Sequence, residues 1–523
     1  MPHLQGTQRD QALQLPPTLD QFIAPENPVR FLDAFVDSLD LEELGFARAT
    51  PARTGRPSYP PGDLLKLFLY GYLNRTRSSR RLEKETHRNV EVMWLLKRLT
   101  PDHKTIADFR KHNLQPLKAT CRQFTLVCKG LDLFGAELVV IDGSKFKACN
   151  GRDRNFTPAK VEKALKRIDQ KLEAYLQEMQ QADQQENQEQ DAEPGLRPQS
   201  TKELQEKIAW LQGRQQWYQD LEGQLKESGE SQISRTDPDS RSMPVQRGTE
   251  VCYNVQMAVD SKHKLIVAHE VRSEVTDQNQ LSGMALQAKE ALAVETLEVA
   301  ADTGYYDGDE VKRCQEAGIT AFVAKAQTSV NVKRGLFTKE DFTYDTHSDT
   351  YTCPAGKVLT FRFEAVELGR EIRYYALPVA VCRDCPLRER CTRNKGGRRI
   401  TRWKHEHVLE AMGERVRARP EVLKQRQEVV EHPFGTMKRA MEAGYFLLKG
   451  RAKVGAEMSL TVLCYNLLRA VNLLGVPRLM EALQARQVSA NGLTRRLLCL
   501  LWRLLAAFCG PISARPAWSL RLG

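Results

Sequence analysis

The feature that most constrains the fold is a short apolar segment that ends in an acid, Leu138-Val139-Val140-Ile141-Asp142. Its four apolar residues are mostly β-branched, which predicts a strand buried on both faces. Asp142 follows directly, and Gly143 then allows the chain to turn away. The segment therefore predicts a carboxylate held at the end of a buried strand.

Two later segments also carry an acid at the end of a regular element. Residues 297–301 form a second, largely apolar strand pattern that ends at Asp302. Glu431 lies at the end of a helical pattern. The chain has 66 acidic residues, and a single acid at a strand end is usually a turn or cap residue, so one acid alone carries little weight. The combination favours convergence of Asp142, Asp302 and Glu431 around metal ions.

The order of the predicted elements is an independent indication of the fold. An insertion follows the first strand, and alternating apolar residues at 251–259 predict a half-buried strand. The elements after it are a strand at 265–271, a helix at 278–292, a strand at 296–301, a helix at 307–318, a short strand at 320–324 and the helix of Glu431. Without the insertion this order resembles the ribonuclease H fold, an α/β fold whose mixed sheet is flanked by helices. The acids would then lie on the first and fourth strands and the last helix.

The insertion, residues 151–235, contains two runs of apolar residues at heptad spacing. A segment rich in Gln, Asp and Glu, with Pro194 and Gly195, separates the two runs. We expect an antiparallel helical hairpin that stands off the core, either for protein contacts or as a passive insertion. The runs are Val161, Leu165, Ile168, Leu172, Tyr175 and Met179, and then Leu204, Ile208, Leu211, Tyr218, Leu221 and Leu225.

Positive charge is concentrated near the amino terminus. The formal net charge is +12, and residues 51–120 hold fifteen Lys or Arg against six Asp or Glu, so +9 lies in this segment. Its short successive helical patterns have a basic face that includes Arg80 and Arg81, and Thr100 with Pro101 predicts one helix start. This pattern suits a helix-turn-helix-like module that binds DNA. The alternatives are an all-helical dimerisation domain and a solvated surface.

A group of cysteines lies between the second acid and the third. One C-x-x-C pair and two further cysteines suit a tetrahedral zinc site, although free thiols or a redox-neutral core fit the spacing equally well. The basic residues after them predict contacts with phosphate, with an exposed loop as the alternative. The cysteines are Cys353, Cys382, Cys385 and Cys391, and the basic residues include Arg398, Arg399 and Arg402.

Cysteine usage and hydropathy also bear on the compartment. Twelve cysteines in a chain whose first twenty residues lack an apolar core predict a reduced, cytoplasmic environment. The longest apolar run, residues 497–510, is about fourteen residues long and contains Arg503. We therefore expect no membrane partner.

With these segments the chain resembles the DDE transposases of bacterial insertion sequences, in the ribonuclease H-like superfamily. The resemblance covers roughly residues 25–475 and implies that Asp142, Asp302 and Glu431 are the metal-binding catalytic triad. It also implies nicking at terminal inverted repeats and attack of the exposed 3′-hydroxyls on target DNA. The segments that carry it are Gly55-Arg56-Pro57, Asp142-Gly143-Ser144-Lys145, Thr236-Asp237-Pro238-Asp239, Tyr253-Asn254-Val255-Gln256, Ala301-Asp302-Thr303-Gly304-Tyr305, Val430-Glu431-His432-Pro433-Phe434-Gly435 and Cys464-Tyr465-Asn466-Leu467.

Such chemistry needs an activated attacking oxygen and a stabilised leaving oxygen, which two divalent ions about 3.5–4 Å apart provide. Mg²⁺, or Mn²⁺, binds through a few carboxylates and the substrate phosphate. Lys438 lies two helical turns after Glu431, so the two are expected on one face, with the lysine reaching a phosphate, although Pro433 interrupts the helical pattern. Arg439 and Lys145 are further candidates for DNA contact.

One subgroup of the family differs from this chain near the third acid. It places Tyr seven and Arg four residues before the Glu, and Lys seven residues after it. The chain has Lys424, Gln427 and Lys438 at these positions, with Arg426 one step from the Arg position. Hairpin chemistry that depends on the Tyr is therefore not expected, whereas the triad is unaffected.

The predicted organisation has five parts. A helical DNA-binding domain (1–130) precedes a catalytic core (131–325 with 420–475) that contains the hairpin insert (151–235). A Cys-rich basic insertion (326–419) and an accessory tail (476–523) complete the chain. The predicted function is metal-dependent cleavage at element ends and strand transfer into target DNA, by a homodimer on double-stranded DNA. The alternatives are a ribonuclease H-like nuclease or integrase and a catalytically silent DNA-binding protein.

Overall fold

The computed structural model describes residues 18–51, 53–54, 57–188, 198–325 and 329–508. These residues divide into two compact units. The helical unit contains the chain up to Leu133, the short segment Met441–Ala443 and the chain from Ala456 onward, and the sheet unit contains Phe134–Ala440 and Gly444–Gly455. The predicted core, by contrast, kept residues as far as 475 with the sheet.

The helical unit forms because apolar residues recur at helical spacing, and the side chains of Asn27, Asn89 and Asp102 cap the starts of three of its helices. Its centre is α2 (Pro61–Leu73), which is buried almost all round, as its sequence predicts. The cap of α5 is Asp102, which accepts a hydrogen bond from the Thr105 amide at 2.6 Å, and not Thr100. The remaining elements before the sheet are η1 (Leu19–Phe22), α1 (Pro28–Asp37), α3 (Ser79–Arg88), α4 (Val90–Leu95), α5 (His103–His112) and α6 (Leu114–Gly130).

The long final helix, α16 (Arg451–Phe508), is broken at Gly475, whose φ of 74° and ψ of 162° are not helical. Its residues 458–474, which the predicted core included, belong to the helical unit, where Cys464 Sγ lies 3.6 Å from the carbonyl oxygen of Leu69. Between Arg451 and Arg486 the helix is long and apolar enough to cross a membrane by length and composition, and 61% of its most apolar window is buried inside the protein. Packing in a protein core accounts for that apolar surface.

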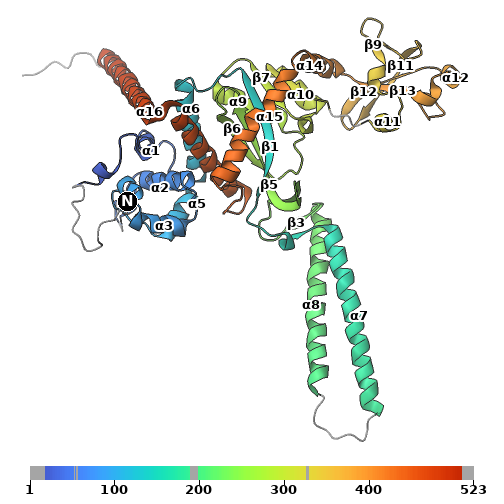
Figure 1. Cartoon of the computed structure of the whole chain (residues 1–523), viewed down its shortest axis with the longest axis horizontal. Coiled ribbons are helices and arrows are strands. Elements are labelled where there is room, and N and C mark those ends of the chain that lie inside the picture. The colour runs from blue at the N-terminus through green and yellow to red at the C-terminus, as the bar shows by residue number, and fades with distance from the viewer. Residues whose placement is uncertain (1–17, 52, 55–56, 189–197, 326–328, 509–523) are drawn as a thin grey trace, which may run out of the picture. The chain divides into compact units, whose positions relative to one another are not determined.

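The sheet unit is built on a mixed six-stranded sheet (Figure 1). Its strand order is β4-β5-β1-β7-β8, and β6 lies beside β5. β1 is antiparallel to β5 and parallel to β7, which is parallel to β8. The strands are β1 (Leu138–Lys147), β4 (Arg241–Val245), β5 (Gly248–Asp260), β6 (Ile266–Arg272), β7 (Leu297–Ala301) and β8 (Ile319–Val323).

Two strands differ from the predictions in an informative way. The chain does not turn away at Gly143, because β1 stays paired with β5 as far as Lys147. β5 is not half-buried, since every residue from Val251 to Asp260 is buried. It lies between β1 on one edge and β4 and β6 on the other, so its polar residues Asn254 and Gln256 are also fully buried.

Helices cover the two faces of the sheet. On one face α15 (Pro420–Gly435) packs on β1 and β7, and Figure 1 shows it crossing β1. On the other, α9 (Leu281–Leu292) packs on β5, β6 and β1. α15 continues through Pro433 and is followed by a π-helical turn at Thr436–Ala440. α10 (Gly308–Glu316) and α14 (Glu406–Ala418) pack near β8.

The predicted helical hairpin is present as α7 (Pro158–Gln188) and α8 (Pro198–Ser228). The short strands β2 (Asn155–Phe156) and β3 (Ile233–Ser234) pair at its base. The turn with Pro194 and Gly195 lies outside the described residues. Phe156, Val161, Leu221 and Leu225 form a small core at the base of the hairpin.

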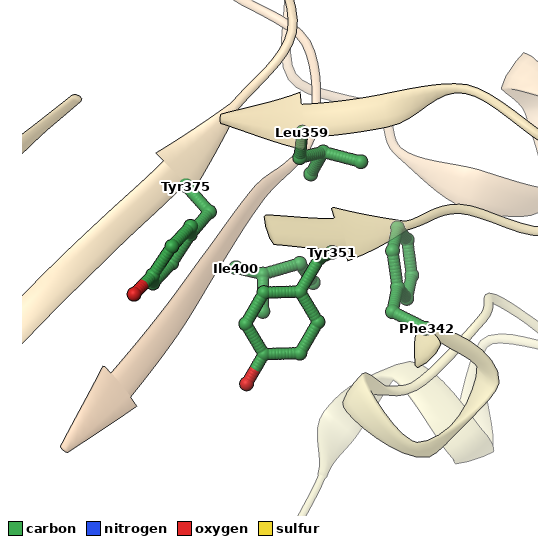
Figure 2. Packing of buried hydrophobic residues seen from close by; sticks show 5 residues of the cluster. All are labelled: Phe342, Tyr351, Leu359, Tyr375 and Ile400. Atoms are coloured by element: carbon green, nitrogen blue, oxygen red, sulfur yellow. The ribbon is translucent and has the colours of Figure 1, made fainter. Parts of the chain in front are cut away.

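The Cys-rich insertion contains a five-stranded antiparallel sheet that the sequence did not reveal, with strand order β13-β12-β11-β10-β9. Figure 2 shows its core, in which Phe342, Tyr351, Leu359, Tyr375 and Ile400 gather on one side of the strands. We call this region the Cys lobe (residues 329–405). Its elements are α11 (Val330–Lys333), η4 (Lys339–Asp341), β9 (Thr343–Asp345), β10 (Thr350–Thr352), β11 (Val358–Glu367), β12 (Arg370–Ala376), α12 (Val379–Arg383), α13 (Arg388–Cys391) and β13 (Arg399–Trp403).

Candidate active site

The first two predicted acids meet at one edge of the sheet because of strand register. β1 and β7 are parallel neighbours, and Val140 pairs with Ala300 as their last partners. Asp142 lies two residues after Val140, and Asp302 lies two residues after Ala300. At this point β7 has ended and no longer pairs with β1. The ends of adjacent parallel strands are the usual place for a site in such a sheet.

The charge on Asp302 acts on Asp142. Burial and then the negative charge of Asp302 raise the pKa of Asp142 to about 6, against the Gly143 amide and Arg426, which act in the opposite direction. The Gly143 amide donates to Asp142 Oδ1 at 2.8 Å, and Arg426 Nη1 lies 3.6 Å from Oδ2. Asp302 Oδ1 accepts from the Gly304 amide at 2.8 Å, which fixes the turn after β7. Two carboxylates of like charge at this edge suit a bound cation.

Glu431 is placed differently. Its side chain is exposed on α15, and its Oε1 accepts a hydrogen bond from Gln427 Nε2 at 2.8 Å. The residue of α15 that reaches Asp142 is Arg426, one step from the position where a related subgroup has Arg. The structure thus brings Asp142 and Asp302 together but leaves Glu431 on its own helix. In the described parts of the chain, no three His, Cys, Asp or Glu side chains are arranged to hold a metal ion.

Lys438 reaches the site from the turn that follows α15. It lies in the π-helical turn after α15, and its Nζ donates to Ser144 Oγ at 2.6 Å and lies 4.7 Å from the centre of the Phe146 ring. Burial lowers the pKa of Lys438, and the charge of Asp142 opposes that effect. The prediction that Lys438 and Glu431 share a face assumed two regular α-helical turns, whereas Lys438 lies in a π-helical turn.

A third acid at this edge, Asp277, was not among the predicted residues. It lies between β6 and α9, and its Oδ1 accepts hydrogen bonds from Asn254 Nδ2 and Gln256 Nε2, both at 2.7 Å. Its charge also raises the pKa of Asp142. The signal in the sequence was the pair of amides, Asn254 and Gln256, on one face of an otherwise apolar central strand. Tyr305, fully buried, donates to Gln256 Oε1 and completes this network.

The residues predicted to contact DNA fall into two groups. Arg80, Arg81, Arg399 and Arg439 are exposed. Arg402 is only 7% exposed, so the prediction of a phosphate contact there is wrong. Its guanidinium binds Glu410 and Tyr351 and stacks 3.6 Å from the centre of the Tyr344 ring.

Two other predicted DNA contacts are partly occupied within the protein. Arg398 is half-buried, with its guanidinium 5.5 Å from the centre of the Phe342 ring. Lys145 Nζ is buried and lies 3.6 Å from Asp277 Oδ1. Its direction follows from β1, where alternate residues point to opposite faces and Lys145 shares its face with Gly143.

The four cysteines of the Cys lobe gather as their motif predicted. Cys353, Cys382, Cys385 and Cys391 all line one cavity of about 30 Å³. Burial raises the pKa of Cys391, and the other three cysteines act in the same direction, although Arg398 opposes them. All four are free thiols. They are close neighbours without the arrangement of a formed metal site.

Comparisons with known proteins agree with the predicted family. The family described as Transposase domain (DUF772) matches residues 17–112, and the family described as Transposase DDE domain matches residues 352–471. The second match covers most of the Cys lobe, Glu431 and Lys438. A comparison with curated protein sequences gave no match.

A solved structure is also similar, the cryo-EM structure of a piggyBac transposase synaptic complex with hairpin DNA. Its identity to this chain is 10%, its TM-score is 0.31, and the alignment covers 88% of this chain and 79% of that one. Because the TM-score is below 0.5, we draw nothing from it. DDE transposases generally use divalent metal ions. With a transposase domain at its amino-terminal end and a transposase DDE domain toward its carboxy-terminal end, the protein is a DDE-type transposase.

Proposed function

We propose that this transposase cuts DNA at the terminal inverted repeats of its element and joins the freed 3′-hydroxyls to target DNA, with Asp142, Asp302 and Glu431 as its catalytic acids. The observation that carries the proposal is the pairing of Asp142 with Asp302 two residues beyond the last β1–β7 pair. Glu431 is included because it lies in the matched DDE domain and on the helix that covers these strands.

We also propose that the sheet unit is ribonuclease H-like. Support comes from the order β6-β5-β1-β7-β8, in which the first three strands are antiparallel neighbours and the last three are parallel. The crossover helices α9 and α10 precede β7 and β8. This topology places the acid of β1 next to the acid that follows β7.

The acidic edge fits divalent cations by its donor chemistry. Mg²⁺ and Mn²⁺ prefer carboxylate oxygens as ligands. The raised pKa of Asp142 indicates that nearby positive charge does not balance the charges of Asp142 and Asp302. Two such ions would activate the attacking oxygen and stabilise the leaving one. Arg426 partly neutralises Asp142 in the metal-free protein.

The protein's own groups have separate tasks in this proposal. The Gly143 and Gly304 amides fix the orientation of Asp142 and Asp302. Lys438, held on Ser144 within reach of the charge of Asp142, would contact a phosphate of the bound DNA. The exposed arginines of α3, Arg80 and Arg81, would bind the DNA backbone elsewhere on a homodimer assembled on two element ends. Such a protein would act in the cytoplasm.

The test is a cleavage and joining assay on DNA that carries the flanking repeats, with Mg²⁺ or Mn²⁺. Asp142→Asn, Asp302→Asn and Glu431→Gln should each abolish both steps, and Asp153→Asn, an exposed acid of η2 (Arg152–Arg154), is the matched control. Activity that persists in one variant would remove that residue from the mechanism. Cleavage without joining would favour a nuclease, and DNA binding without either would favour a silent DNA-binding protein.

A second proposal concerns the Cys lobe, where we infer a structural zinc ion. It is supported by the four thiols around one cavity. Metal analysis of the purified protein should find zinc that is lost in the Cys382→Ser/Cys385→Ser variant and retained in Cys314→Ser, a buried cysteine of α10. Equal zinc in all three proteins would exclude the site.

A further inference from the structure

The base of the α7–α8 hairpin carries a cluster of aromatic rings with cations over them. Phe156 meets Trp217 and Tyr218 edge to face, with ring centres 5.4 and 6.1 Å apart. Lys160 Nζ lies 5.0 Å from the centre of the Phe156 ring, and the Arg235 guanidinium lies 5.5 Å from the centre of the Trp217 ring. Both cations are on exposed side chains, so the rings hold positive charge at the surface.

The same arrangement continues along α8. The Arg214 guanidinium lies 5.8 Å from the centre of the Tyr218 ring and 4.9 Å from the centre of the Trp210 ring. Arg214 is exposed, and Trp210 is 60% exposed. A guanidinium stacked on aromatic rings keeps its orientation and remains charged, which prepares it to bind an anion.

The first helix of the hairpin adds two more cations. Arg167 and Lys171 follow Lys160 by seven and eleven residues, or about two and three helical turns, so the three lie on one face of α7. All three are exposed, and they span about 16 Å along the helix. The contact of Lys160 with Phe156 places this face beside the aromatic cluster. We call Lys160, Arg167, Lys171, Arg214 and Arg235 the cation strip.

Acids lie on the other side of the hairpin. Asp169 is nine residues from Lys160, half a turn out of phase, and it accepts a hydrogen bond from Gln215 Nε2 at 2.6 Å. Together with Glu173 it lines an open hollow between the two helices. Two further acids pair with lysines of their own helix, Glu162 with Lys166 at 2.7 Å and Glu222 with Lys226 at 2.9 Å.

The cation strip, by contrast, is not neutralised within the protein. In the part of the chain that the structure describes, no salt bridge joins any of its members to an acid. Lys160 Nζ donates to the backbone oxygens of Arg152 and Asn155 at 2.7 and 2.9 Å, which fixes its position and leaves its charge uncompensated. Like charges on one face repel one another, so the strip favours a partner that carries many negative charges.

We propose that the cation strip binds the phosphate backbone of double-stranded DNA, as a contact surface of the hairpin outside the acidic edge. A duplex carries one negative charge per about 1.7 Å of its axis, so the strip can meet several phosphates at once. Lysine and arginine contacts of this kind position DNA without reading its bases. The inference goes beyond the proposed chemistry, because it requires DNA but none of the three catalytic acids.

A second copy of this chain is the competing partner, since the acidic side of its hairpin could face the strip. That side has little free charge to offer, because Glu162 and Glu222 are already paired with lysines and Asp169 binds Gln215. Charge complementarity therefore favours DNA, and the second copy becomes an outcome of the test.

The test is fluorescence anisotropy of a labelled duplex at several salt concentrations with EDTA, so that neither divalent ions nor cleavage contribute. Arg167→Gln/Lys171→Gln/Arg214→Gln removes three exposed charges and leaves the base of the hairpin intact. We expect its affinity to fall at least about tenfold at about 100 mM salt, and the slope of log K against log salt to fall by about 2–3. The matched control, Lys166→Gln/Lys202→Gln/Lys226→Gln, removes the same charge from exposed positions off the strip and should change affinity less than about twofold.

Circular dichroism melting checks that both variants are folded. If the triple variant does not fold, Arg167→Gln/Lys171→Gln alters α7 alone and should still lower the slope by about 2. Wild-type affinity and slope in the strip variant, or an equal loss in the control, would overturn the inference. Sedimentation velocity without DNA covers the remaining outcome: a smaller assembly in the strip variant with unchanged DNA binding would assign the strip to a second copy and overturn the DNA contact.

Discussion

The acidic edge of the six-stranded sheet and the Cys lobe both collect metal-binding side chains, but they hold them in different ways. At the acidic edge, Asp142 and Asp302 are placed by strand register, and buried amides fix Asp277. In the Cys lobe, the four cysteines lie on loops and short helices around a cavity beside an aromatic core. The first arrangement is fixed by the fold before any ion binds, whereas the second leaves more of its order to the ion.

This difference indicates in which region a small substitution should affect catalysis and in which it should affect only local stability. Substitutions that crowd the acidic edge should damage catalysis, because strand register and buried amides hold its acids in place. Comparable substitutions in the Cys lobe should alter local stability and leave the chemistry intact. The following predictions test that contrast from the largest expected effect to the smallest.

Among the substitutions that crowd one of the two regions, Gly143→Ala should have the largest effect. Its new methyl group would lie 2.4–2.5 Å from Gln256 Nε2 and Asp277 Oδ1, too close to be accommodated without moving one of them. We expect cleavage to fall by at least about a hundredfold and the free energy of unfolding to fall by about 1–3 kcal/mol. The assays are single-turnover cleavage and denaturant unfolding.

The matched control for this substitution is Gly283→Ala in α9, where a methyl group meets nothing within 4 Å. It should stabilise the protein by about 0.5–1 kcal/mol and leave cleavage unchanged. Full activity in Gly143→Ala would show that the acidic edge is not rigid.

Asp142→Asn should stabilise the metal-free protein while abolishing cleavage. The pKa of Asp142 is raised to about 6 by burial and by Asp302, so the folded state disfavours the ionised form. This penalty is absent below the unfolded pKa near 3.8, grows as pH rises, and is complete above about pH 6. At pH 7.5 the variant should gain up to about 3 kcal/mol, and the gain should vanish near pH 3.5. Thermal unfolding with a chelator measures it; a gain that is constant with pH would contradict the assignment.

The sequence predicted the strands of the acidic edge better than it predicted the third acid that lies there. Apolar runs and turn residues identify β1, β7 and β8 because burial on both faces leaves little choice of residue. Which residue of α15 faces Asp142 depends on the phase of the helix, and no motif in the sequence indicates that Arg426, rather than Glu431, is the residue that reaches it. Asp277 was missed because it lies in a loop, where an acid ordinarily signals a turn.

In the Cys lobe the sequence predicted that the four cysteines gather, but it wrongly placed Arg402 on the basic surface. The C-x-x-C pair is a local pattern, so its proximity to the two other thiols was open to prediction. The strands β11 and β12 were missed because β11 is mostly exposed and β12 mostly half-buried, so neither shows clean alternation. Arg402 looked like part of a basic surface because its partner, Glu410, lies on α14, beyond the basic segment.

Glu410→Gln should therefore destabilise the region around β13 without affecting cleavage chemistry. The hydrogen bonds from Arg402 hold the pKa of Glu410 below its ordinary value, so its contribution is present above the unfolded pKa and is lost as pH falls through the folded one. Glu410 is 42% exposed, and solvent screening reduces the expected loss to about 1–2 kcal/mol at pH 7. Unfolding followed at pH 7 and pH 3 should show the difference only at the higher pH.

Gly397→Ala is the counterpart of Gly143→Ala in the Cys lobe and should have the smallest effect. Gly397 has a φ of +84°, and a methyl group there would lie 3.1 Å from Cys382 Cβ and 3.2 Å from its Sγ. The backbone strain alone costs about 1 kcal/mol, and Cys382 lies on the short helix α12, which can shift by a few tenths of an ångström. We expect a loss of about 1–2 kcal/mol in stability, weaker zinc retention during dialysis against a chelator, and unchanged single-turnover cleavage. If cleavage fell as far as in Gly143→Ala, the two metal-binding regions would be coupled, and the contrast between a rigid acidic edge and an adaptable Cys lobe would have to be abandoned.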